Sequence, residues 1–201
     1  EGNLQRRETE FQPIPYRLLL GNRVYSGWSM RAWLVLKLSG ADFETEVIPL
    51  YTDAFEAYRR IYRPARQLPA LIIGSGPDRR VVWDSLAITE YIAEQFPDAG
   101  IWPMEVEERA AARSLCAEMH SGFRALRISM PFNSRRRYLS FRPPDEIKDE
   151  IRRLCELWEW VLSSFGSDEP YLFGSRFTAA DAFFAPVMCR FHTYGIELED
   201  R

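Results

Sequence analysis

The first fifty residues hold a strand, a helix and a second strand in close succession. Tyr16 to Leu20 is a short apolar strand candidate, and residues 29–39 carry several large apolar side chains before Gly40, a typical helix stop. Glu44 to Leu50 is the second strand candidate. Because parallel strands need a long crossover connection, usually a helix, this order predicts a parallel pair in an α/β domain.

The following segment predicts a helix, a hairpin and a further helix. Asp53 is expected to cap a helix that ends at Pro64, with an acid three residues later completing a capping box. Residues 70–73 and 81–83 flank a Gly-Ser-Gly-Pro-Asp turn, which is typical of a β-hairpin. The next helix is expected from Ser85 to about Phe96.

No strand pattern appears after residue 105, so the second half is expected to be all helical. A single helix of about 25 residues is predicted from Glu105 to Ser129, and apolar residues recur at helical spacing over 147–165. Thr178, with Asp181 three residues later, predicts a capped last helix. We interpret this pair as a folding signal rather than as part of a site.

These patterns divide the chain into four parts. Residues 1–15 are expected to be a flexible lead-in, 16–97 an α/β domain, 98–104 a linker and 105–201 an all-helical domain. The chain stops soon after its last helix without a capping element, so we expect a natural carboxyl-terminal segment to be missing.

Composition excludes several classes of function. The net charge of −3 argues against a nucleic-acid partner, which needs a concentrated positive face. No apolar run approaches the length of a membrane span and no secretory signal is visible, so a cytoplasmic location without a membrane partner is expected. Three well-separated cysteines and two histidines suggest neither a disulfide framework nor a metal site.

Ser26 opens the first predicted helix, in the segment Ser-Gly-Trp-Ser-Met-Arg that ends at Arg31. Its structural interpretation is an amino-terminal cap, since serine is among the best capping residues. The same geometry also suits a bound anion, because unpaired amides and the positive end of the helix dipole meet there. Both interpretations remain open on this segment alone.

Two further motifs precede the hairpin and the third predicted helix. In the first, Gln67 and Leu68 lead into Pro69 at the start of a strand. If the Leu68–Pro69 bond is cis, the backbone of Leu68 can pair with a peptide-like ligand, and otherwise the proline is an ordinary strand-edge residue. In the second, Asp84 and Ser85 form either a helix cap or a binding site in which Asp84 pairs with an ammonium and Ser85 binds a carboxylate.

The order and spacing of these motifs resemble a cytosolic glutathione transferase of bacterial type, over about residues 16 to 198. The resemblance implies a thioredoxin-like amino-terminal domain that binds glutathione as co-substrate and an all-helical domain that lines the second-substrate pocket. It implies Ser26, five residues before Arg31, as the catalytic residue. The glutathione-binding residues that it implies are Gln67, Leu68, Pro69, Asp84 and Ser85.

Some departures from the family pattern narrow the expected activity. Ser26 stands where thiol oxidoreductases of the family have cysteine, which argues against disulfide exchange. Maleylacetoacetate isomerases carry Ser-Ser-Cys where this chain has Tyr25, Ser26 and Gly27, so an isomerase is a minor alternative. A non-enzymatic binding or assembly module with the same fold is the other alternative.

The resemblance therefore implies an enzyme that activates the glutathione thiol for attack on a small electrophile or a peroxide, with a role in detoxification and a homodimeric state. Arg124 or Arg127, in an arginine-rich stretch, could bind an anionic second substrate, although a solvated face is the simpler explanation. His120 is expected to be an ordinary packed or surface histidine. No metal is expected.

Overall fold

The computed structural model describes residues 16–138, 140–166 and 169–198, so the expected lead-in at 1–15 lies outside the described residues. In chain order the amino-terminal elements are β1 (Tyr16–Leu20), α1 (Gly27–Ser39), β2 (Phe43–Val47), α2 (Asp53–Ile61), β3 (Ala70–Ile73), β4 (Arg80–Val82) and α3 (Ser85–Gln95). Short 3-10 turns occupy Gly76–Asp78 and Pro97–Ala99. The second half contains α4 (Val106–Ser121), α5 (Arg124–Ser129), α6 (Asp145–Phe165) and α7 (Ala179–Tyr194).

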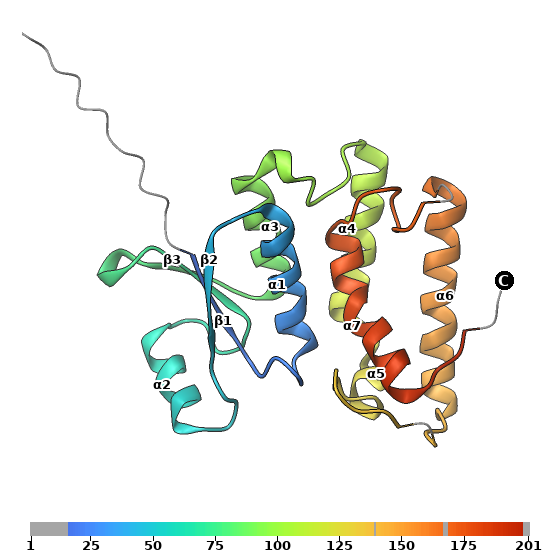
Figure 1. Cartoon of the computed structure of the whole chain (residues 1–201), viewed down its shortest axis with the longest axis horizontal. Helices are drawn as coiled ribbons and strands as arrows, with labels where there is room; N and C mark the ends of the chain where they lie inside the picture. The colour runs from blue at the N-terminus through green and yellow to red at the C-terminus, as the bar shows by residue number, and fades with distance from the viewer. Residues whose placement is uncertain (1–15, 139, 167–168, 199–201) are drawn as a thin grey trace, which may run out of the picture.

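The four strands form one mixed sheet in the order β2-β1-β3-β4. β1 and β2 are parallel, as the strand-helix-strand pattern predicts, and β3 pairs antiparallel with both β1 and β4. Side chains alternate between the two faces: Leu18 and Leu20 pack with α1 and α3, whereas Leu19 packs with α2. The sheet therefore has α1 and α3 on one face and α2 on the other (Figure 1).

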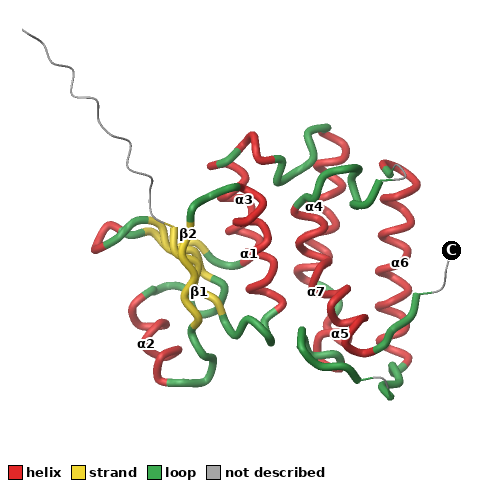
Figure 2. The backbone as a smooth tube through the Cα atoms, in the orientation of Figure 1, coloured by secondary structure: helices red, strands yellow, loops and turns green. Residues whose placement is uncertain are grey.

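The helical half lies against α1 and α3 on the side away from the sheet (Figure 2). One core cluster joins the two halves, because Val35 of α1 and Ile88 of α3 share it with Cys116 of α4 and Phe183 of α7. The approach of α1 to α7 is close: a Cβ at Gly27 would lie 3.0 Å from the Cβ of Pro186. The start of α1 is therefore fixed at the junction of the two halves.

The predicted cap of α2 is wrong by one residue. Thr52, not Asp53, is the amino-terminal cap, and its hydroxyl oxygen accepts a hydrogen bond from the Phe55 amide at 3.4 Å. Asp53 is instead the first residue of the helix, where a carboxylate is favoured by the helix dipole. Threonine and aspartate are both good caps, so their adjacent positions could not be separated by sequence pattern.

The single helix predicted from Glu105 to Ser129 is also wrong. The structure has two helices, α4 and α5, separated by Gly122 in an extended conformation and Phe123 in the left-handed region at φ 58°. Glu150 of α6 accepts hydrogen bonds from the amides of Ala125 and Leu126 at 3.1 and 2.7 Å. This carboxylate satisfies the free amides at the start of α5 and stabilises the break.

The last helix begins as predicted. Thr178 is the amino-terminal cap of α7, and the Asp181 carboxylate accepts hydrogen bonds from the Thr178 amide and hydroxyl at 2.8 and 3.1 Å. The same carboxylate accepts a hydrogen bond from the Leu172 amide at 3.0 Å, so it also holds the segment that precedes the helix.

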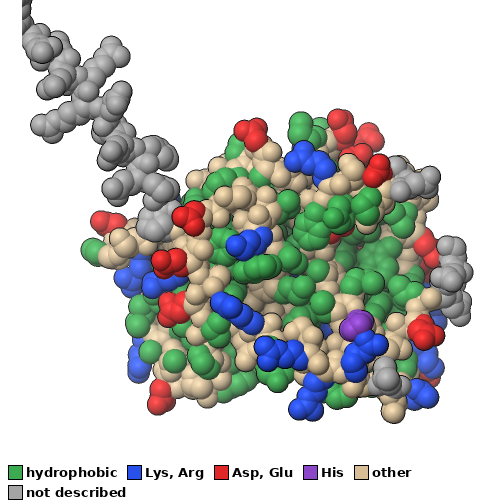
Figure 3. Space-filling view, in the orientation of Figure 1, with side chains coloured by type: hydrophobic (Ala, Val, Ile, Leu, Met, Phe, Trp, Pro, Cys, Tyr) green, Lys and Arg blue, Asp and Glu red, His purple; other side chains and the backbone are tan. Residues whose placement is uncertain are grey.

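The second half presents an apolar hollow on the surface. Figure 3 shows hydrophobic side chains gathered over α6 and α7, where a hollow of about 620 Å³ is lined by Trp158, Phe184 and Met188 among others. None of the helices that the structure describes has the length and apolar character of a membrane span.

Candidate functional site

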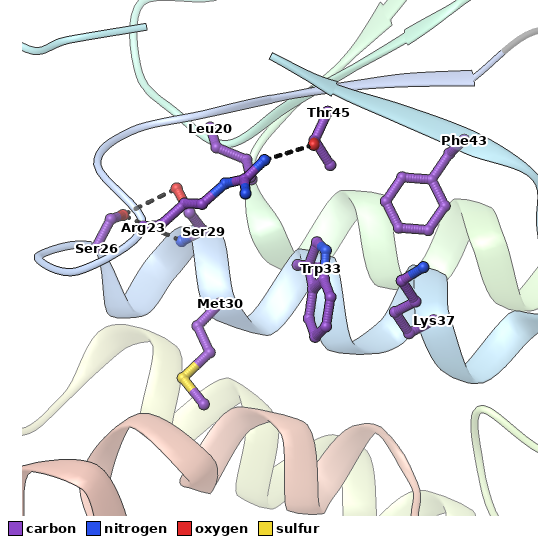
Figure 4. A pocket seen from close by; sticks show the side chains of 9 residues that line it. All are labelled: Leu20, Arg23, Ser26, Ser29, Met30, Trp33, Lys37, Phe43 and Thr45. Atoms are coloured by element: carbon purple, nitrogen blue, oxygen red, sulfur yellow. Dashed lines mark hydrogen bonds between the residues drawn. The ribbon is translucent and has the colours of Figure 1, made fainter. Parts of the chain in front are cut away.

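The Ser26 hydroxyl caps the amino terminus of α1 (Figure 4). Its oxygen accepts a hydrogen bond from the Ser29 amide at 3.2 Å, and the hydroxyl donates to Ser29 Oγ at 2.9 Å. Ser29 Oγ is itself held by the Gly21 amide at 3.0 Å. The capping interpretation is therefore confirmed, and the hydroxyl lies at the positive end of the helix dipole, where negative charge is stabilised.

The turn before β3 lies beside this helix start. The β1–β3 ladder ends with Leu19 opposite Ala70, so the next residues, Leu20 and Pro69, are neighbours across the two strands. A glycine follows Leu20, and a Cβ at that position would lie 3.4 Å from the Cβ of Ser26. The sheet register therefore brings the proline turn close to Ser26.

The Gln67 to Pro69 turn is held from the opposite face of the sheet. The Leu68–Pro69 peptide bond is cis. The buried Tyr58 of α2 donates a hydrogen bond from its hydroxyl to the Gln67 carbonyl at 2.7 Å. Burial raises the pKa of Tyr58 to about 12, so this phenol remains a donor at any physiological pH. Tyr58 thus fixes the backbone of the turn.

Asp84 caps α3 and carries two partners. One carboxylate oxygen accepts a hydrogen bond from the Leu86 amide at 3.1 Å, and the other lies 3.1 Å from Nε2 of His120. The hydrogen bond from His120 holds the pKa of the Asp84 carboxyl below its ordinary value, against the opposing effect of partial burial. Asp84 is therefore an ionised acid at neutral pH.

Ser85, the first residue of α3, is fully buried in this structure. Its carbonyl accepts a hydrogen bond from the Thr89 hydroxyl at 2.8 Å, whereas its own hydroxyl has no hydrogen-bond partner among the described residues. A buried hydroxyl without a partner is uncommon and costs free energy. This donor at a helix amino terminus is covered and has no acceptor in the described part of the chain.

His120 of α4 and Trp28 of α1 connect the two helix starts. Their rings meet edge to face with centroids 5.3 Å apart, and the far edge of the imidazole contacts Asp84. The Nδ1 atom of His120 is buried and has no hydrogen-bond partner in the described part of the chain. The expectation that His120 is an ordinary histidine misses this contact, which links α1, α3 and α4.

Two of the implied site residues share a pocket. Gln67 and Asp84 line a pocket of about 420 Å³ together with His120 and Trp83. Ser26 lines a different pocket, of about 370 Å³, on the side of α1 that faces β2. Across residues 16–138, 140–166 and 169–198, no cluster of histidine, cysteine and acidic side chains is suited to hold a metal ion.

Arg31 is buried behind this site. Its guanidinium is stacked between the rings of Trp28, at 4.6 Å, and Phe183, at 5.0 Å, and its Nε and Nη1 atoms have no hydrogen-bond partner among the described residues. Burial, together with the neighbouring Arg127 and Arg190, lowers the pKa of Arg31 to about 9. Arg31 is still positively charged at neutral pH.

The two arginines expected to bind an anionic second substrate are placed differently. Arg127 stacks on Trp28 at 4.6 Å, but its guanidinium also donates to the carbonyls of Gly122 and Met119 at the end of α4. Arg124 is exposed at the start of α5. Arg127 therefore borders the site mainly as a cap of α4.

The fold defines the class of this protein. A four-stranded sheet with a cis-proline turn, joined through α1 to a helical domain, is the thioredoxin-like architecture with a helical second domain. Residues 25–95 match the family model for the glutathione S-transferase N-terminal domain.

Comparisons with individual proteins agree. The chain is 26% identical to glutathione S-transferase GstA of Escherichia coli O157:H7 over 180 residues, which cover 85% of this chain and 81% of GstA. It is 30% identical to a probable maleylacetoacetate isomerase of Caenorhabditis elegans over 107 residues, 51% of this chain. That alignment spans only 48% of the nematode protein, about half its length.

Solved structures show the same architecture. A glutathione transferase homologue from Burkholderia, solved with bound glutathione, aligns with a TM-score of 0.65 at 25% identity, covering 92% of this chain and 84% of that one. Glutathione transferase Omega 2S from Trametes versicolor shares the fold, with a TM-score of 0.68 at 22% identity over 88% of this chain and 72% of that one. Residues 25–95 therefore belong to the glutathione S-transferase N-terminal domain family, and the described part of the chain shares the fold of the glutathione transferases.

Proposed function

We propose that this protein is a glutathione transferase in which Ser26 activates the thiol of bound glutathione. The observation that carries the proposal is the position of the Ser26 hydroxyl, at the amino terminus of α1 and next to the turn that ends at Pro69. The link through Trp28 and His120 to Asp84 supports a single site formed by both helix starts.

The tripeptide is proposed to bind along the proline turn and the start of α3. The ionised Asp84 pairs with the ammonium of the γ-glutamyl end, and the unpartnered Ser85 hydroxyl donates to its carboxylate. Because Ser85 is covered in this structure, its hydroxyl reaches the ligand only after a local movement at the start of α3. Gln67 and the backbone of Leu68 pair with the cysteinyl part of the ligand.

Thiol activation is the chemical task of the site. A free thiol with a pKa of about 8.5 is only about 3% thiolate at pH 7, and lowering the pKa by about two units raises this to about 75%. The Ser26 hydroxyl now donates to Ser29, so it must turn toward the sulfur to stabilise the thiolate. Ser29 retains its hydrogen bond from Gly21 when this happens.

The thiolate then attacks an electrophilic atom of the second substrate or a peroxide oxygen, and Ser26 forms no covalent bond with either reactant. In a conjugation, a carbon–sulfur bond forms and the leaving group departs with its electron pair. With a peroxide, the oxygen–oxygen bond breaks and the sulfur is oxidised to a sulfenic acid, which a second glutathione converts to the disulfide. Arg124 and Arg127 are the proposed partners of an anionic second substrate: Arg127 stacks on Trp28 of α1, and Arg124 is exposed at the start of α5.

The Ser26→Ala variant tests this role. Removing one hydrogen bond to a developing charge typically lowers turnover by roughly 10² to 10³, so this loss is expected while glutathione affinity changes little. Thiolate absorbance in the glutathione complex should titrate at higher pH in the variant than in the wild type. Thr52→Ala is the matched control, because it removes a helix cap of similar strength away from the site.

Equal titration and equal turnover in Ser26→Ala and the wild type would assign activation to another residue, with Tyr25 and Ser29 as the next candidates. Ser26→Cys adds a positive result: a low-pKa thiol at this helix start should form a mixed disulfide with glutathione and shift activity toward thiol exchange. A screen of conjugation, peroxide reduction, ether cleavage and maleylacetoacetate isomerisation then identifies the reaction.

We infer further that the protein works in the cytoplasm as a homodimer that detoxifies small hydrophobic or anionic electrophiles. The family relationship supports this, together with the general preference of soluble proteins for closed twofold dimers. A non-enzymatic binding role is the competing proposal. It predicts glutathione binding without turnover of any substrate in the screen.

A further inference from the structure

The pocket on the β2 side of α1 is chemically unlike the pocket that holds Gln67 and Asp84. It has a volume of about 370 Å³ and lies between α1 and the edge strand β2 (Figure 4). Ser26 lines one end and Lys37, near the last turn of α1, lines the other. The pocket therefore begins at the proposed thiol site and follows α1 away from it.

Two cations line this pocket. Arg23, in the loop between β1 and α1, reaches across to β2 and donates a hydrogen bond to the Thr45 hydroxyl at 2.9 Å (Figure 4). Four of the five guanidinium N–H groups are not used by that bond. Lys37 is an exposed cation on α1. No aspartate or glutamate lines the pocket in the part of the chain that the structure describes, so its charge is uncompensated.

Two aromatic rings, Trp33 and Phe43, line the pocket beside these cations. The indole of Trp33 is 38% exposed, although it belongs to a helix whose other face is packed in the core. The Lys37 ammonium lies 5.7 Å from the centroid of Trp33 and 5.0 Å from that of Phe43. The rings and the cations therefore adjoin, as in sites that accept a flat apolar body with an acidic group.

We propose that the pocket between α1 and β2 binds a small aromatic carboxylate or sulfonate, with its acid group on Arg23 and its ring against Trp33 and Phe43. Arg23 is the acid partner because its guanidinium is held in place by Thr45 and retains free donors in a planar fork that fits a carboxylate. Lys37 adds a second positive charge beside the ring. This site shares Ser26 with the proposed thiol site, but its acid-binding and aromatic residues lie outside the pocket of Gln67 and Asp84, so it does not depend on the proposed transferase activity.

Calorimetry with 2-naphthoate and its neutral analogue 2-naphthamide tests the site on the full chain. The anion should bind more tightly than the amide, and Arg23→Gln should weaken binding of the anion by about tenfold while leaving the amide unchanged. Lys37→Gln should weaken the anion by about threefold. Lys148→Gln is the matched control, because Lys37 and Lys148 are the only lysines of the chain and Lys148 lies on α6.

The aromatic wall requires a second measurement. Trp33→Leu should weaken both ligands, since it removes the ring without altering the charge of the pocket. Binding of 2-naphthoate that is unaffected by Arg23→Gln, or that falls equally in Lys37→Gln and Lys148→Gln, would overturn the proposal. Equal affinity of the wild type for 2-naphthamide and 2-naphthoate would also overturn the proposal. Glutathione binding is measured in a separate titration without 2-naphthoate. A failure of the transferase proposal can therefore be distinguished from a failure of the aromatic-acid site.

Discussion

His120 joins two helix starts that are far apart in the sequence. It packs edge-on against Trp28 of α1 and hydrogen-bonds Asp84 of α3, and the bond to Asp84 is the largest cause of the lowered pKa of that carboxyl. Because the pKa of Asp84 is depressed in the folded state, this acid stabilises the fold at pH values above its unfolded-state pKa, ordinarily 3.8. That stabilisation is lost as pH falls through the lower folded-state pKa.

We predict that His120→Asn raises the pKa of the Asp84 carboxyl toward its ordinary value and weakens glutathione binding. The hydrogen bond that favours the ionised carboxylate is removed, and Asp84 is less firmly oriented toward the ligand. Carbon-13 NMR of the carboxyl groups measures the titration. His192→Asn is the control, since His192, the other histidine of the chain, lies on α7 and contacts Arg137. An unchanged Asp84 titration in His120→Asn contradicts the prediction.

Arg31 and Arg190 are two buried arginines with opposite hydrogen-bonding status. Arg190 donates to the carbonyls of Met130 and Pro186 at 2.8 and 3.3 Å, whereas two nitrogen atoms of Arg31 have no partner among the described residues. Burying a charge without hydrogen bonds costs several kcal/mol, of which stacking on Trp28 and Phe183 returns only a part. Arg31 is thus a destabilising residue at the edge of the site.

We predict that Arg31→Met leaves the free energy of unfolding unchanged or raises it by about 1 to 2 kcal/mol, because methionine fills the space without a buried charge. Arg190→Met should instead lower it by about 1 to 3 kcal/mol, since two buried carbonyls lose their donor. Urea denaturation of both variants gives the comparison. A clear loss of stability in Arg31→Met would show that the aromatic contacts outweigh the burial of charge.

At the scale of elements, the break between α4 and α5 places His120 and Arg127 at the site. α4 ends at Ser121 with Gly122 as its cap, and the chain passes through the left-handed Phe123 before α5 begins. Arg127 donates back to the carbonyls of Gly122 and Met119, and Glu150 caps α5 from α6. The end of α4 is thereby stabilised from both sides of the break.

Gly122→Ala distinguishes a broken helix from a continuous one by the sign of its effect. In a continuous helix, alanine would stabilise by about 1 kcal/mol relative to glycine. In the observed conformation a Cβ would lie 2.9 Å from the carbonyl oxygen of Glu118, so the backbone must shift. We predict that the variant is destabilised by about 1 to 3 kcal/mol, measured by urea denaturation. A Gly122→Ala variant that is more stable than the wild type would contradict the prediction and favour the single helix expected from sequence.

At the scale of the whole molecule, we predict a homodimer. Light scattering at micromolar concentration should give twice the chain mass of 23.5 kDa, because closed twofold dimers are the commonest soluble oligomers. A mass that stays near 23.5 kDa at this concentration contradicts the prediction. Measuring again with saturating glutathione tests whether the ligand influences association.

The sequence by itself determined the features that depend on neighbouring residues. The sequence predicts Thr178 as a helix cap and offers a cap as one of two interpretations for Ser26 and for Asp84, and the parallel β1–β2 pair follows from the crossover length. A cap involves residues within one turn of each other, and the crossover joins consecutive elements, so each leaves a local pattern. Thr52 and Asp53 show how precisely a cap can be located from sequence: two adjacent residues that are both good caps give the same pattern.

Tertiary structure alone decided the contacts between distant residues. His120 contacts Asp84, which lies 36 residues earlier in the chain. Glu150 caps α5 by accepting a hydrogen bond from the amide of Ala125, which lies 25 residues earlier. The exposure of Trp33 and the burial of Arg31 likewise depend on which elements pack against α1. Such contacts form because folding brings whole faces together, and no spacing along the chain encodes which side chains will then meet.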